Sequence, residues 1–149
     1  MNKTDYPFLG TGWKFPPVFE LNTDPATGIV SATVSLVSGE EDINESLNIL
    51  LSTSLGERVM QPQYGCNLTD YIFDPLDSGM IGYIKDRVQN SILFYESRIT
   101  IENITVTEPD SSDLWEGKFT IQLEYSIPNT NSRFNYVYDF YLNEAAQPI

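Results

Sequence analysis

Apolar and polar residues alternate over three segments in the last third of the chain, which is the pattern of strands with one buried face. In the first segment, residues 99–106, the alternation changes parity, and a β-bulge near Glu102 and Asn103 would keep its apolar residues on the core side. The second segment covers residues 119–127 and the third residues 134–142, with a Pro-Asn turn between them. The pattern predicts a three-stranded antiparallel meander.

Two segments have helical spacing instead. The first runs over residues 40–52 and begins with consecutive acidic residues, which the helix dipole favours. The second begins at Asp77 or Ser78, which can cap it, and continues to about Ser97. Between them, residues 68–73 allow only a short helical turn. The expected buried stripes are Ile43, Leu47, Leu50 and Leu51 in the first helix and Ile81, Ile84, Val88, Ile92 and Tyr95 in the second.

The N-terminal segment is different, because residues 1–28 show no period but contain several prolines and aromatic residues. We expect an irregular, aromatic-rich arm that either covers the core of its own domain or lies on a partner. Residues 29–37 alternate and predict one more strand. Residues 29–149 are therefore predicted to form a single α+β domain, in which two main helices pack on one face of an antiparallel or mixed sheet of about four strands.

Composition excludes several kinds of partner and chemistry. The 149 residues include 8 Lys plus Arg and 21 Asp plus Glu, a net charge of −13 that repels nucleic acids and anionic membrane surfaces. The absence of histidine removes Ser-His-Asp triads, Cys-His pairs and histidine zinc sites. The single cysteine, Cys66, cannot form an internal disulfide and is expected to be a small buried side chain. We expect no metal, no cofactor, no nucleic acid, no direct membrane contact and synthesis in the cytoplasm.

One cluster of charged and turn-forming residues suggests a specific site: Gly56, Glu57, Arg58, Pro62, Tyr64 and Gly65. Adjacent Glu and Arg side chains on an extended segment point to opposite faces, so each needs a partner other than its neighbour. Such a pair is compatible with internal salt bridges, catalysis or docking. A glycosidase would need a second carboxyl group within about 5 to 9.5 Å of Glu57, and spacing identifies none.

The segments around this cluster resemble the baseplate protein W family of contractile tails. The resemblance rests on ILLSTSLGERVMQPQYG at residues 49–65, on Leu68, on YIFDP at residues 71–75 and on FLGTGWKFPP at residues 8–17. Cys66 stands where a small polar residue is usual in that family. The family includes baseplate wedge subunits and sheath initiators of contractile phages, and related subunits of type VI secretion systems and extracellular injection particles. Some members carry the label lysozyme.

The resemblance implies a structural, non-enzymatic subunit, present in six copies around a hub of an assembled baseplate. It implies that Glu57 and Arg58 dock the subunit on the wedge, supported by Gly56, Pro62, Tyr64 and Gly65. It also implies that the sheet accepts a strand from the sheath subunit, so that the chain initiates sheath assembly. The residues expected at that contact are Tyr136, Tyr138, Phe140 and Leu142, although these aromatic side chains would also suit the core of the domain itself.

Two other functions remain open at this stage. A peptidoglycan hydrolase would use Glu57 as its acid, and a turbidity-clearing assay on cell walls would detect it. A binding module for an unknown target would be distinguished by neighbouring genes, because baseplate and sheath genes travel together. The same genes would separate a phage from a secretion system or a released particle.

Overall fold

The computed structural model describes residues 7–66, 68, 78–107, 118–128, 130 and 132–141. The chain divides into two compact units, Met1–Ser46 and Leu47–Ile149. The boundary falls inside the first helix, α1 (Glu40–Ser52), so this helix contributes its first turns to one unit and its last turns to the other. Both predicted helices and the predicted meander are present, which confirms the α+β class.

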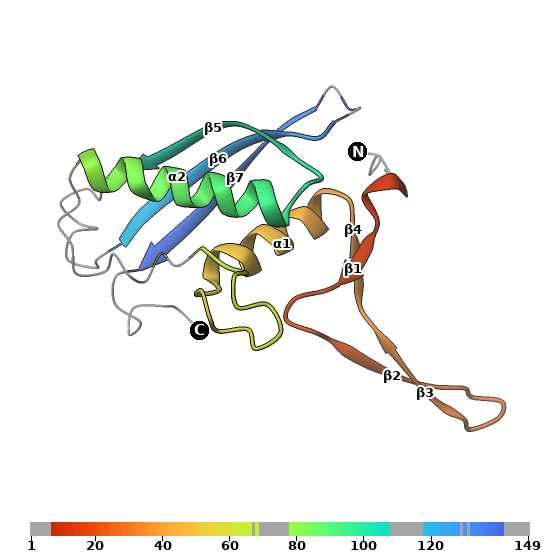
Figure 1. Cartoon of the computed structure of the whole chain (residues 1–149). Helices are drawn as coiled ribbons and strands as arrows, with labels where there is room; N and C mark the ends of the chain where they lie inside the picture. The colour runs from red at the N-terminus through yellow and green to blue at the C-terminus, as the bar shows by residue number, and fades with distance from the viewer. Residues whose placement is uncertain are drawn as a thin grey trace. The chain divides into compact units, whose positions relative to one another are not determined.

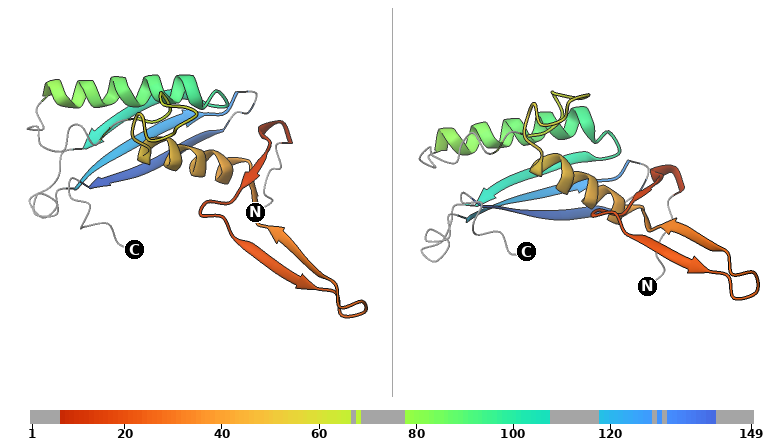
Figure 2. Two further views of the ribbon diagram at one scale, coloured as in Figure 1. Left: turned by 60° about the horizontal axis from the view of Figure 1, so that its bottom comes forward. Right: turned by 90° about the horizontal axis from the view of Figure 1, so that it is seen from below.

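The second unit is built on a three-stranded antiparallel sheet of β5 (Thr100–Thr107), β6 (Lys118–Ser126) and β7 (Arg133–Tyr141), in the order β5-β6-β7. The long helix α2 (Ser78–Tyr95) packs along β5. Figure 2 shows α2 and the Leu47–Ser52 part of α1 on one face of this sheet, as predicted. The arrangement leaves β5 and β7 as edge strands among the described strands.

The parity change in β5 is a real bulge. The pairing register of β5 with β6 shifts between Ile101 and Asn103. Beyond the shift Ile104 and Val106 are buried, and before it Ile99 is buried as well. The extra residue therefore keeps the apolar residues on both sides of it facing the core.

The central strand β6 and the two helices supply most of the core. Every second residue of the predicted β6 segment is buried, and so are the predicted positions of α1 and the middle three of the five predicted for α2, because their periods match the pleat and the helical turn. The two end positions of the predicted α2 stripe are not in the core: Ile81 is partly buried and Tyr95 is 38% exposed. The buried residues are Phe119, Ile121, Leu123, Tyr125 and Ile127 in and just after β6, Ile84, Val88 and Ile92 in α2, and Ile43, Leu47, Leu50 and Leu51 in α1.

The end of α2 is held by a charged pair. Glu96 is buried and Arg98 meets it with two nitrogens, Nε at 2.7 Å from Oε1 and Nη2 at 2.6 Å from Oε2. A buried carboxylate needs such compensation. The pair fixes the turn from α2 into β5 and, with it, the position of Tyr95.

The first unit corrects two predictions. A short 3-10 turn at Pro7–Leu9 is followed by β1 (Thr11–Trp13), which pairs with β4 (Leu36–Ser38), and by β2 (Phe19–Thr23), which pairs with β3 (Val30–Val34). The arm is therefore not irregular between these residues. The predicted strand at residues 29–37 pairs with the arm rather than with the meander, so the main sheet has three described strands instead of about four.

The sequence pattern does not reveal β1 and β2 because both strands are short, are separated by prolines and have no buried face. Two predictions lie outside the described residues: the turn at 68–73 apart from Leu68, and the sheath contact of Leu142.

The sheet register predicts a strong difference between neighbouring positions of β6. Leu123→Ala should lower the free energy of unfolding by about 2 to 5 kcal/mol, because it empties a buried site. Glu124→Ala, one residue along the strand and on the exposed face, should change it by no more than about 0.5 kcal/mol. Urea denaturation of both variants tests this, and equal losses would contradict the register.

Candidate functional site

The predicted docking cluster lies on one closed loop, residues 53–66, here called the motif loop. It leaves α1 at Thr53 and returns at Cys66, whose backbone N–H donates to the Thr53 carbonyl at 3.0 Å. Gly65 sits at this crossing with a φ of 127°, and a Cβ there would collide with the Thr53 carbonyl oxygen. Only glycine allows the two segments to approach so closely in this conformation.

Inside the loop, short-range hydrogen bonds form a series of turns. The Gly56 N–H donates to the Pro62 carbonyl at 2.7 Å and so joins the two sides of the loop. The Glu57 carboxylate accepts the backbone N–H of Ser54 at 2.9 Å, while the Glu57 N–H donates to the Ser54 carbonyl at 3.2 Å. These hydrogen bonds between polar groups of the loop hold its backbone in one conformation.

Arg58 and Tyr64 connect the loop to the end of α2. The Arg58 guanidinium carbon lies 4.1 Å from the centre of the Tyr64 ring, and that ring meets Tyr95 edge-on at 5.0 Å between centroids. Burial raises the pKa of Tyr64 despite the nearby Arg58 charge, which acts in the opposite direction. The adjacency of Glu57 and Arg58 predicts that each residue needs a partner other than its neighbour. In the structure Glu57 contacts Ser54 and Arg58 contacts Tyr64, so both partners lie within the chain.

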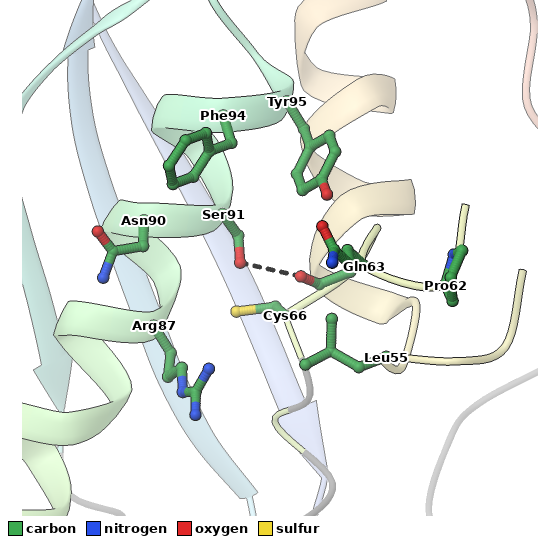
Figure 3. A pocket seen from close by; sticks show the side chains of 10 residues that line it. Leu55, Pro62, Gln63, Cys66, Arg87, Asn90, Ser91, Phe94 and Tyr95 are labelled. Carbon is green, nitrogen blue, oxygen red and sulfur yellow. Dashed lines mark hydrogen bonds between the residues drawn. The ribbon is translucent and has the colours of Figure 1, made fainter.

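A second tie joins the base of the loop to α2. The Ser91 hydroxyl donates to the Gly65 carbonyl at 2.9 Å (Figure 3). Beside it Cys66 is buried, and burial raises the pKa of its thiol to about 11. A thiol in that state is poorly reactive, so Cys66 is the small buried side chain that the sequence predicts.

A groove of about 370 Å³ runs between the motif loop and α2 (Figure 3). Loop residues form one wall and α2 residues the other. Its lining comprises Leu55, Pro62, Gln63, Gly65 and Cys66 from the loop, and Arg87, Asn90, Ser91, Phe94 and Tyr95 from α2. Leu55 and Phe94 also expose apolar surface to solvent, which makes the rim of the groove apolar.

The tip of the motif loop carries two residues that the sequence analysis missed. Val59 is 92% exposed and Met60 is 91% exposed. The sequence does contain a signal, because Val59 and Met60 are two adjacent apolar residues inside a segment rich in Gly, Pro and polar residues. The segment has no periodicity, however, so the pattern does not indicate whether these residues are exposed or buried.

Three of the predicted sheath-contact residues lie on the same face of β7, and the fourth, Leu142, is outside the described residues. Phe140 is buried and its ring lies 4.8 Å from that of Phe119. Tyr136 and Tyr138 are partly buried, and burial raises the pKa of each to about 12. These three side chains pack against the sheet's own core, which is the alternative that the sequence left open. Val137 points to the other face and is exposed.

Within the part of the chain that the structure describes, no group of three or more His, Cys, Asp and Glu side chains is placed to hold a metal ion. Among the described helices, none is both long and apolar enough to cross a membrane.

Known proteins similar to this chain include proteins of baseplates. Baseplate protein W of Escherichia phage P2 is 29% identical over 87 residues, which are 58% of this chain and 71% of that protein. A putative tail lysozyme from Geobacter sulfurreducens has a structure with a TM-score of 0.64 and 40% identity, covering 74% of this chain and 96% of that one. A chain of the six-fold symmetrised anti-feeding prophage baseplate has a TM-score of 0.57 and 27% identity, covering 91% of this chain and 88% of that one.

The family model described as baseplate wedge protein gp25 matches residues 37–132, which include α1, the motif loop, α2 and most of the meander. The resemblance found in the motif residues is thus confirmed over more than half of the chain. The chain belongs to the gp25 family of baseplate wedge proteins.

Proposed function

We propose that this baseplate subunit docks on the wedge of a contractile injection machine through the motif loop and initiates the sheath through the edge of β7. The observation that carries the docking half is the conformation of the loop. Its backbone is closed and tied to α2, yet its tip holds two apolar side chains almost fully in water. Apolar side chains displayed on an ordered loop suit the apolar centre of a contact with a partner.

The roles of Glu57 and Arg58 in this proposal follow from their contacts. Glu57 caps the first turn of the loop and Arg58 stacks on Tyr64, so both shape the surface that the partner meets. Arg58 is exposed, and its planar guanidinium suits carboxylates or carbonyls on a wedge subunit. Gly56, Pro62, Tyr64 and Gly65 support docking by closing the loop.

The sheath half of the proposal rests on the backbone of β7. Among the described strands β7 pairs with β6 alone, so its other edge offers alternate N–H and C=O groups to an added strand. The aromatic side chains at 136, 138 and 140 serve as the support of this strand rather than as its contacts. We further propose six copies per baseplate, in line with the six-fold symmetrised baseplate of the anti-feeding prophage.

A peptidoglycan hydrolase is the other candidate, suggested by the name of the Geobacter sulfurreducens protein. The geometry favours a structural role instead. Glu57 lies on an exposed loop and its carboxylate accepts the Ser54 N–H, whereas a glycosidase acid needs a desolvated cleft that keeps it protonated. We therefore propose that the chain is not an enzyme and acts only within the assembled baseplate after synthesis in the cytoplasm.

Replacing both tip residues tests docking. Val59→Ser with Met60→Ser should weaken binding to purified wedge subunits by about tenfold or more, because apolar burial is lost at the contact. The melting temperature should stay within a few degrees, since both side chains are exposed. Gln61→Ser, the next exposed residue on the same loop, is the matched control and should bind as the unaltered chain does. Unchanged binding of the double variant would exclude the tip as the docking surface.

Amide exchange tests strand addition. When the sheath subunit is added, alternate amides of residues 133–141 should become protected, because only those facing away from β6 gain a new partner. The other edge strand, β5, is the internal control and should exchange at its original rate. Sheath binding that protects β5, or that protects neither edge, would contradict the assignment to β7.

A further inference from the structure

The β2–β3 hairpin, residues 19–34, has one apolar face and one polar face. Directly paired residues of an antiparallel ladder share a face. Phe19 pairs with Val34, Leu21 with Ala32 and Thr23 with Val30 along the ladder of β2 and β3, whose course Figure 1 shows. These six side chains therefore lie on one side of the hairpin. The opposite side carries Glu20 paired with Thr33 and Asn22 paired with Ser31.

The apolar face is open to solvent. Phe19 is 63% exposed, Leu21 75% and Val30 60%. Trp13, which meets the Phe19 ring edge-on at 6.2 Å, is exposed as well and extends the same apolar surface. A two-stranded hairpin is marginally stable alone in water, and exposed apolar surface of this kind marks a contact site.

The turn of the hairpin is nevertheless well defined. The Asp24 carboxylate accepts the Ala26 N–H and the Thr27 hydroxyl, both at 2.8 Å, and the first of these bonds is the main cause that lowers the pKa of Asp24. The Gly28 N–H donates to the Asp24 carbonyl at 2.8 Å, with Gly28 at a φ of 68°. This turn orders the hairpin before any contact, which reduces the entropy cost of binding.

The charge of the segment that contains the hairpin indicates what kind of surface covers it. Residues 15–46, which follow Lys14, contain no lysine or arginine. They contain six acidic residues, of which Glu20 and Asp24 belong to the hairpin and Glu40, Glu41, Asp42 and Glu45 to α1. A second copy of a chain with a net charge of −13 would bring acid against acid, whereas a surface with basic residues around an apolar centre would be complementary.

We propose that the apolar face of the β2–β3 hairpin is a second docking surface, and that its occupant is a different protein subunit with an apolar centre and a rim of Lys and Arg. The inference rests on the proposed function in one respect, because it assumes that this subunit belongs to the same baseplate. The hairpin lies outside residues 37–132, so the family match does not account for it. It is also separate from the motif loop in sequence and in chemistry.

The test uses the full chain assembled with the other subunits of its baseplate. Leu21→Thr with Val30→Thr makes the apolar face polar and places β-branched residues, which favour strands, at both positions. Asn22→Thr with Ser31→Thr introduces the same residue at the adjacent, oppositely facing positions, where polar residues already stand, and is the matched control. We expect the first variant to lose about tenfold or more in incorporation at equal protein concentration, and the control to be incorporated normally. Incorporation of the unaltered chain should also fall with added salt, which screens the attraction between the acidic segment and the basic rim.

A photo-crosslinker at position 21 identifies the occupant. The inference predicts crosslinks to another subunit at an apolar site flanked by Lys or Arg, together with slower amide exchange of residues 19–34 in the assembly. Crosslinks to a second copy or back to the same chain, or unchanged exchange, would overturn it. If the unaltered chain fails to enter the baseplate at all, the proposed function is wrong. If it enters with an unprotected hairpin, only this inference is wrong.

Discussion

The close approach of Gly65 to the Thr53 carbonyl is the contact on which the proposed docking surface depends. It closes the motif loop at its base, through the hydrogen bond from Cys66 to Thr53, and the Ser91 hydroxyl then ties the closed base to α2. Because this base is fixed, the tip is displayed outward instead of collapsing on the core. One backbone crossing therefore links the end of α1, the wall of the groove and the exposed apolar tip.

The structure also divides the motif into residues that shape the loop and residues that offer surface. Glu57 and Arg58 are the most conspicuous part of the motif, yet the Glu57 carboxylate is used within the loop and the Arg58 guanidinium lies on Tyr64. Val59 and Met60 lack any intrinsic chemistry, but they are the residues that solvent reaches almost completely. Docking by such a surface depends on preorganisation of the loop as well as on the contacts it makes.

Sequence periodicity predicted the elements that have one buried face. It located α1, α2, the three strands of the meander and the bulge at residues 101–103, because a buried face imposes its period on the residues. It failed for β1 and β2, whose pairing with β4 and β3 is set by contacts between short exposed strands. It also could not show that Val59 and Met60 are exposed, or that Phe140 belongs to the core, since both depend on tertiary contacts.

The central claim is that a closed motif loop forms the wedge-docking surface, and two glycine variants test it most directly. Both Gly56 and Gly65 have a positive φ, but a Cβ meets nothing within 4 Å at Gly56 and the Thr53 carbonyl at Gly65. Gly56→Ala should therefore still bind purified wedge subunits, and its free energy of unfolding should fall by about 1 kcal/mol. Gly65→Ala should abolish binding and speed amide exchange over residues 54–64, while the exchange of β6 stays slow. Wild-type binding by Gly65→Ala with an opened loop would contradict the claim.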